Sequence, residues 1–265
     1  MQRQLNKTIK QIMAEIPVTA DILNDFDIAC SDCNVADCLL KDIVDIHDLP
    51  EGREVELMYL LEKAIYPDRD VVKPEIKGNG RKKESKKLKY SPPMKKLVDE
   101  HVLITKWIAL IPEVLPTLDI NSEDGKQLVK DSVDFIRSYA DKFHHAKEEE
   151  ILFKYFDESL DIIRVILTDH NTARGYTKAI LEALDNGDRE TIIEKFTAYA
   201  ELLSEHIRKE NEILLPWMDR NLSTRDVGEI FSKFNDVDSR FGKELPLKYE
   251  SFVSNIEKNL MVKGA

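Results

Sequence analysis

The chain has 265 residues, carries a formal net charge of −11 and contains only nine glycines. This length can bury a sizeable core in one or two domains, and long stretches alternate apolar with charged residues at helical spacing, which predicts an all-α protein. The acidic balance argues against general nucleic-acid binding, because that function needs a basic surface to neutralise phosphates.

No run of eighteen or more apolar residues occurs, so we expect no membrane span. Residues 1 to 16 contain basic residues but no apolar core or small-residue cleavage site of an export signal. We therefore expect a cytoplasmic protein.

Residues 1 to 67 are predicted to form a small helical domain around a cluster of cysteines. Cys30, Cys33 and Cys38 lie within one nine-residue segment. In a cytosolic protein such a cluster indicates redox or metal chemistry rather than a disulfide framework. Cys30 and Cys33 are candidate redox thiols, and all three with His47 could bind a metal; the third interpretation is that the thiols are incidental.

Residues 68 to 92 are predicted to be a basic linker. Prolines and glycines interrupt the helical periodicity here, and residues 77–89 read KGNGRKKESKKLK. Such a run of like charges is usually solvent-exposed, and contact with a partner is the alternative.

Residues 93 to 221 are predicted to form an up-down-up-down four-helix bundle, because short connections between long helices favour antiparallel neighbours. Asn186-Gly187 is a typical helix stop, and Asp188 is placed to cap the next helix. The four expected helices span 93–115, 122–156, 159–184 and 189–221.

Residues 222 to 265 are predicted to be a C-terminal helical extension. It contains two expected helices, 223–241 and 245–260, and Ser223 and Asp226 have the spacing of a capping box at the start of the first.

Five of the six histidines lie in the predicted bundle, and each of its four helices carries at least one. His101, His170 and His206 have apolar residues at offsets of three, four and seven, so they lie on the apolar faces of their helices. Glu210 follows His206 by four residues and shares its face.

The second helix offers both His144 and His145. His144 shares its face with apolar residues and His145 with polar ones, so the interpretation is that only His144 faces the core. The segment HHAKEEEILF from His144 also aligns with HIRKENEILLP from His206. This internal repeat gives Glu148 the place of Glu210 and argues against pairing His145 with Glu149.

These inward-facing groups predict a metal centre, because unpaired buried carboxylates are strongly disfavoured. Imidazole with carboxylate suits iron, manganese or zinc, and six ligands exceed the need of one tetrahedral zinc. Two iron ions sharing both glutamates, with an oxo or hydroxo bridge and room for a small ligand, fit best, and manganese stays an alternative. The predicted ligands are His101, His144, Glu148, His170, His206 and Glu210.

Four motifs in this order resemble the hemerythrin-like HHE cation-binding domain family, over about residues 93 to 220. They are DEH at 99–101, HHAKEEEILF at 144–153, DHNTAR at 169–174 and HIRKENEILLPW at 206–217. The resemblance implies a non-haem di-iron centre in a four-helix bundle, held by the same six residues with both glutamates bridging. A ferritin-like oxidase is disfavoured, because its Glu-x-x-His motif has the opposite order.

One position departs from the oxygen-carrying hemerythrins, which have a second histidine on the third helix where this chain has Arg174. The four-His, two-Glu set is instead similar to the subgroup that includes iron–sulfur cluster repair di-iron proteins. The N-terminal region also resembles their cysteine-bearing helical domain, although those proteins usually have adjacent cysteines.

The resemblance implies a non-haem di-iron protein that binds or reacts with oxygen or nitric oxide, in iron–sulfur cluster repair or a stress response. One alternative is a non-catalytic protein that binds, stores or senses oxygen or iron. The other is an enzyme, a nitric oxide reductase or a peroxidase-like protein. The expected partners are a small diatomic ligand and a protein for electron or iron transfer.

Overall fold

The computed structural model describes residues 2–26, 28, 39–41, 43–46, 49, 51–72 and 90–263. The chain forms two compact units, the first of residues 1–89 with 160–162 and 213–220, and the second of residues 90–159, 163–212 and 221–265. The described residues are helical, and the β-type pairing among them is one isolated bridge between Thr8 and Leu39. The predicted all-α fold is confirmed. The four-part division of the chain stays a prediction.

The first unit is built from short helices around a small apolar core. Thr8 and Gln11 form a capping box at the start of α2, and the core includes Ile9, Leu57 and Leu61, all at most 1% exposed. Cys30, Cys33, Cys38, His47 and the lysine-rich run lie outside the described residues. The helices are α1 (Gln2–Leu5), α2 (Ile9–Glu15), α3 (Val18–Asp25), α4 (Ile43–Ile46) and α5 (Glu51–Ile65).

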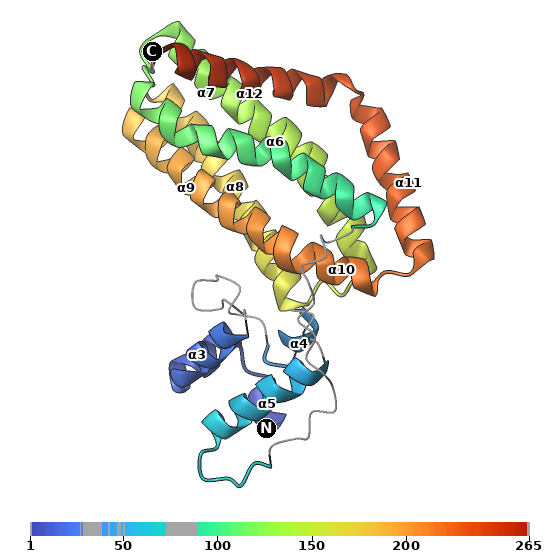
Figure 1. Ribbon diagram of the computed structural model, residues 1–265. Coiled ribbons are helices and arrows are strands. Elements are labelled where there is room, and N and C mark those ends of the chain that lie inside the picture. Colours follow the sequence, from blue (N-terminus) through green and yellow to red (C-terminus); the bar gives the residue numbers. More distant parts are fainter. Residues whose placement is uncertain are drawn as a thin grey trace. The chain divides into compact units, whose positions relative to one another are not determined.

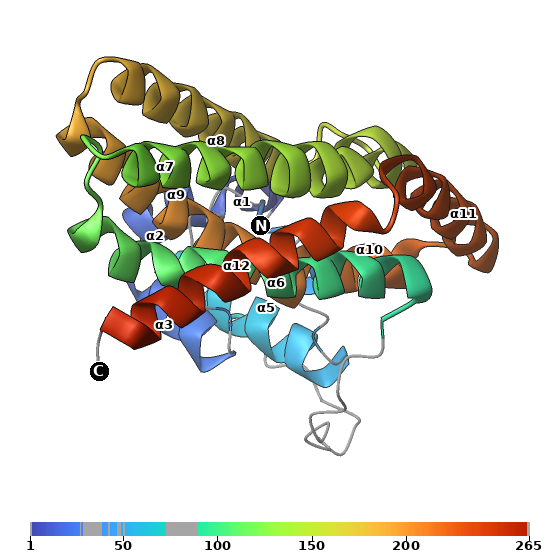
Figure 2. The same cartoon turned by 90° about the horizontal axis from the view of Figure 1, so that it is seen from above.

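The second unit contains four long helical segments in which each helix runs antiparallel to the next (Figures 1 and 2). Gly187 ends the third segment with a φ of +68°, and Asp188 caps the fourth by accepting a hydrogen bond from the Thr191 backbone, both as predicted. The segments begin with α6 (Pro92–Val114), α7 (Glu123–Phe135), α8 (Asp161–Asp185) and α9 (Arg189–Lys209).

The second and fourth segments are not regular α-helices along their whole length. The turns that follow α7 and α9 are π-helical, with hydrogen bonds from residue i to i+5 and more than 3.6 residues per turn. Side chains beyond these turns therefore rotate away from the faces that α-helical spacing predicts. The π-helical stretches are η2 (Ile136–His145), η3 (Glu148–Leu152) and η5 (Glu210–Leu214), and the short turns are η1 (Leu115–Thr117) and η4 (Phe153–Tyr155). Helix α10 (Leu215–Asn221) follows η5 in the chain and is assigned, except for Asn221, to the first unit.

The C-terminal helices α11 (Thr224–Phe241) and α12 (Glu244–Lys263) pack on the bundle, and α12 lies along α6 in Figure 2. The predicted capping box of Ser223 and Asp226 is present. On α12, Tyr249 packs edge-on against Phe135 with ring centroids 5.3 Å apart, and its hydroxyl donates to an Asp134 carboxylate oxygen at 2.9 Å. The extension therefore shares the core of the bundle.

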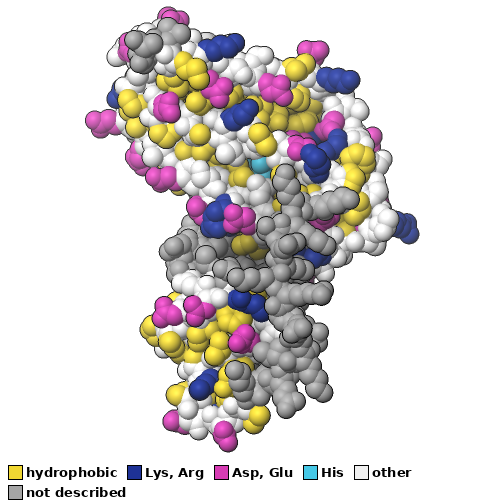
Figure 3. Space-filling model, in the orientation of Figure 1, with side chains coloured by type: hydrophobic (Ala, Val, Ile, Leu, Met, Phe, Trp, Pro, Cys, Tyr) yellow, Lys and Arg dark blue, Asp and Glu magenta, His cyan; other side chains and the backbone are white. Residues whose placement is uncertain are grey.

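The visible face of the protein mixes Lys and Arg with Asp and Glu side chains, and histidine shows only as one small spot (Figure 3). None of the helices in the described part of the chain is long and apolar enough to cross a membrane.

Candidate metal centre

The six predicted ligands meet in the middle of the bundle. They come from all four helical segments, and each is at most 2% exposed. Their nitrogen and oxygen atoms form two groups of four, with the atoms of each group within 4.8 Å of one another. Both groups contain Glu148 and Glu210; His101 and His144 complete the first group, and His170 and His206 complete the second.

Each glutamate reaches one histidine of each pair. One oxygen of Glu210 (Oε2) lies 3.2 Å from His101 Nε2 and 3.2 Å from His206 Nε2. The two oxygens of Glu148 divide between the pairs, with Oε1 3.7 Å from His144 Nε2 and Oε2 3.6 Å from His170 Nε2. Both carboxylates therefore lie between the two histidine pairs.

Several of these buried atoms have no hydrogen-bond partner. They are both carboxylate oxygens of Glu148, both of Glu210, and the Nε2 atoms of His101 and His144. A buried polar atom without a partner costs free energy, so native proteins rarely leave six of them in one place. Imidazole nitrogens and carboxylate oxygens together suit a transition metal. The residues present therefore fit a metal centre.

The electrostatics of the metal-free site follow from burial and from the crowding of like groups. Burial raises the pKa of Glu148 well above its ordinary value, and the nearby Glu210 carboxylate raises it further. Burial acts on Glu210 in the same direction, but the His206 and His101 imidazoles outweigh it and hold the pKa of Glu210 below its ordinary value. Without a metal, Glu148 therefore takes up a proton more readily than Glu210.

Two of the histidines, His144 and His170, are held in the neutral form that a metal binds. Burial lowers the pKa of His144 well below its ordinary value, and His101 and His145 lower it further. Burial and the neighbouring His145 and His206 act in the same way on the pKa of His170. At neutral pH these two imidazoles need not lose a proton before binding a metal.

Each of the four histidines turns its second ring nitrogen, Nδ1, toward a polar side chain on another helical segment. Metal-binding histidines characteristically have such a partner, which fixes the ring and directs Nε2 at the metal. The partners are Asn211 for His101 at 2.8 Å, Glu100 for His144 at 2.9 Å, Glu149 for His170 at 2.7 Å and Asp169 for His206 at 3.5 Å.

Two buried lysines hold these partner carboxylates. Lys147 Nζ contacts Glu100, and Lys209 Nζ donates to Asp169 Oδ2 at 2.6 Å, while the lysine residues are at most 1% exposed. Lys147 also pairs with Asp238 of α11 at 2.6 Å, which ties the C-terminal extension to the centre. Sequence reasoning missed both lysines, although each directly precedes a predicted ligand glutamate in the aligned repeat.

Burial raises the pKa of Glu100 to about 7, and Lys147 counteracts that rise. Asp169 differs, because hydrogen bonds from His206 and Lys209 outweigh its burial and leave its pKa below the ordinary value. The two histidine pairs thus have similar geometry, but the carboxyl partner of His144 has a raised pKa and that of His206 has a lowered one.

The interpretation that His145 faces away from the core is wrong. His145 is 3% exposed, stacks on His170 with ring centroids 3.8 Å apart and an interplanar angle of 15°, and forms a group of possible ligand atoms with His170 and His206. Burial lowers the pKa of His145 to about 4. The physical reason is the π-helical stretch η2, whose wide turns bring both His144 and His145 to the inner face.

Arg174 stands where oxygen-carrying hemerythrins have a further histidine. Its Nε donates to Asp141 Oδ1 at 2.8 Å, and its Nη2 donates to Glu149 Oε1 at 2.7 Å. Glu149 is the carboxylate that accepts from His170. Arg174 therefore acts on the centre through Glu149 rather than as a ligand.

The comparison with protein families agrees with this site. Residues 93–218 match the family described as "Hemerythrin HHE cation binding domain", which is just under half of the chain. This segment is a hemerythrin-like helical bundle with metal-binding character.

The relatives are distant. The chain is 23% identical over 174 residues to "Uncharacterized protein Rv1995" of Mycobacterium tuberculosis (strain ATCC 25618 / H37Rv), which covers 62% of this chain and 68% of the relative. The same values hold for "Uncharacterized protein Mb2018" of Mycobacterium bovis (strain ATCC BAA-935 / AF2122/97). No solved structure matches the chain significantly.

Proposed function

We propose that this protein holds two non-haem iron ions and binds or reacts with oxygen or nitric oxide. The observation that carries the proposal is that both buried glutamates are shared by two pairs of histidines. In this assignment His101 and His144 would hold one ion, His170 and His206 would hold the other, and both ions would share Glu148 and Glu210. Bound iron would supply the redox chemistry and the open coordination positions that a small diatomic ligand needs.

The surrounding residues of the chain keep this site ready for metal. Glu100, Glu149, Asp169 and Asn211 fix the four imidazole rings, so that little reorganisation accompanies binding. Burial of all six ligands excludes bulk water from the site, which strengthens every electrostatic interaction within it. This arrangement supports a resident metal centre rather than a transient surface site.

The first test is metal analysis of the full-length protein purified without oxygen, followed by titration with oxygen and nitric oxide read by absorbance. We expect about two irons per chain and a spectral change with at least one of the two gases. One zinc per chain, or a fully folded protein that never takes up metal, would refute the proposal.

We further propose that the protein belongs with the four-His, two-Glu subgroup and acts in iron–sulfur cluster repair or a stress response. Arg174 in place of a fifth histidine supports this assignment, because it leaves a ligand position open. Transfer of iron to an apo-cluster acceptor is the expected result. A stable, reversible oxygen spectrum would indicate a carrier instead, and steady consumption of nitric oxide with a reductant would indicate an enzyme.

Cys30 and Cys33 are proposed to supply redox thiols to this function. The double variant Cys30→Ser/Cys33→Ser should retain its iron but cycle more slowly between oxidation states. Unchanged redox cycling in the double variant would count against any role for these thiols.

A further inference from the structure

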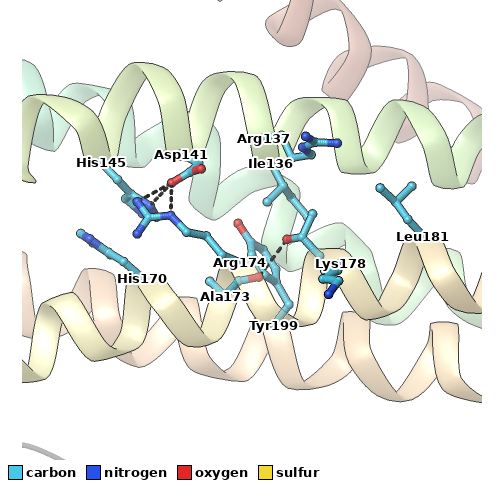
Figure 4. A pocket seen from close by; sticks show the side chains of 11 residues that line it. Ile136, Arg137, Asp141, His145, His170, Ala173, Arg174, Lys178, Leu181 and Tyr199 are labelled. Atoms are coloured by element: carbon cyan, nitrogen blue, oxygen red, sulfur yellow. Dashed lines mark hydrogen bonds and ion pairs between the residues drawn. The ribbon is translucent and has the colours of Figure 1, made fainter.

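A pocket of about 350 Å³ lies between η2, α8 and α9, beside one half of the metal centre (Figure 4). His145 and His170 line its inner end, whereas neither His101 nor His144 lines it. The volume is several times that of a diatomic molecule and lies at the lower end of the range for small-molecule sites. The pocket therefore has room for a ligand beyond the one expected at the metal.

One buried polar group of the pocket has no hydrogen-bond partner, the hydroxyl of Tyr199, a residue that is 0% exposed. His145 Nδ1 instead faces the Asp141 carboxylate, with Oδ1 at 3.7 Å (Figure 4). Burial raises the pKa of Tyr199 above its ordinary value, so the hydroxyl keeps its proton and remains a donor. Leaving such a group unsatisfied costs free energy that a ligand accepting its hydrogen bond would recover.

The charge of the lining indicates what kind of ligand this is. Arg137, Arg174 and Lys178 line the pocket together with one carboxylate, Asp141, although the chain as a whole carries a charge of −11. Arg174 is paired with Asp141 and Glu149, and Lys178 with Glu182 on its own helix. Lys178 is highly exposed, and Figure 4 shows it with Arg137 on the side of the pocket away from His145. Cations around a concave site raise the local concentration of anions.

The apolar part of the lining limits the ligand's polarity. Ile136, Ala173 and Leu181 supply apolar surface to the lining. A multiply charged anion would lose more hydration here than the single donor group replaces. A monoanion of a few atoms, such as a short carboxylate, fits both parts of the lining.

We propose that this pocket is a binding site for a small monoanion that accepts a hydrogen bond from Tyr199 beside the His170 side of the metal centre. Binding itself requires only the pocket. What the anion does there, whether as ligand or as co-substrate of the metal, rests on the proposed di-iron function.

The test uses the full-length protein with its metal content measured, and formate and azide as probes. Calorimetry measures the affinity for formate, and the antisymmetric stretch of azide in the infrared reports its hydrogen bonds. Tyr199→Phe removes only the hydroxyl, so we expect formate binding about tenfold weaker and a shifted azide band. Tyr139→Phe is the matched control, because Tyr139 is also buried in the bundle but does not line the pocket; it should change neither value.

A second variant tests the proposal independently, in case Tyr199→Phe does not fold. Arg137→Gln/Lys178→Gln alters two exposed residues and should weaken formate binding several-fold at low salt, with the difference shrinking as salt rises. Formamide, which is neutral, should bind at least tenfold more weakly than formate. The proposal is overturned if formate binds equally well in wild type and in Tyr199→Phe, or if formamide competes equally.

These outcomes separate the two proposals. If the protein contains no metal but binds formate through Tyr199, the di-iron function is refuted and the anion site is supported. If it contains two irons and Tyr199→Phe leaves the formate affinity unchanged, the di-iron function is supported and the anion site is refuted.

Discussion

Replacing Lys147 with methionine tests whether the C-terminal extension stabilises the metal centre through buried charge. Lys147 lies between Glu100 and Asp238, and the side-chain exposures of the three are 0%, 11% and 34%. Removing one partner of a buried ion pair costs about 3–5 kcal/mol, because the remaining charge is left uncompensated. Since Asp238 is partly exposed, we expect about 3 kcal/mol of lost stability for Lys147→Met.

The loss should depend on pH in a defined direction. Burial already raises the pKa of Glu100 to about 7 against the opposing effect of Lys147, and without the lysine that pKa rises further. At pH 6 Glu100 can then take up a proton and so avoid the free-energy cost of a buried, unpaired charge, whereas in the unfolded chain it stays ionised. A carboxyl whose pKa is raised in the folded state destabilises the fold as pH rises, so the loss should be larger at pH 8 than at pH 6.

Urea unfolding of the chelated, full-length protein measures this effect, with Lys95→Met as the control. Lys95 pairs with Asp99 on the same helix as Glu100, but their side chains are 63% and 61% exposed, so we expect a loss below about 0.5 kcal/mol. Adding Glu100→Gln to Lys147→Met should restore part of the stability, because it removes the uncompensated charge. If Lys147→Met unfolds at the same urea concentration as Lys95→Met, the buried-charge argument fails.

Three further results are expected. Glu148→Gln should reduce bound metal from about two ions per chain to one or fewer, measured by elemental analysis, while exposed Glu150→Gln leaves it unchanged. Because burial raises the pKa of Glu148, metal binding should release protons and its affinity should rise with pH; calorimetry in buffers of different ionisation enthalpy measures this release, and a buffer-independent heat would contradict it. Arg174→Gln should weaken metal binding roughly tenfold, because it removes the hydrogen bond that holds Glu149 in place beside His170. Equal affinity in Arg174→Gln and exposed Lys130→Gln would refute that role.

Local rules were enough to predict most of the helices. Caps and stops depend on residues close together in the chain, so the Asp188 cap, the Gly187 stop and the capping box at Ser223 could all be identified. The inward faces of His101, His170 and His206 followed from the 3.6-residue period, and each of these histidines is buried. The internal repeat placed Glu148 opposite Glu210 without knowledge of the packing.

For His145 the 3.6-residue period predicted the wrong face of the helix. The spacing of apolar residues does not by itself decide whether a turn is α- or π-helical. The packing of its side chains against the neighbouring helices contributes as well. The π-helical stretch η2 buries His145 beside His144, which α-helical spacing would place on the polar face.

Sequence patterns were sufficient to predict the all-α fold, the ends of most helices and a set of six inward-facing histidines and glutamates. Which side chains surround that set is a property of the tertiary packing. Glu100, Lys147 and Asp238 are separated by 47 and 91 residues, and Arg174 and Glu149 lie on different helices. Contacts of this kind depend on the rotation and vertical offset of one helix against another, which no local period encodes.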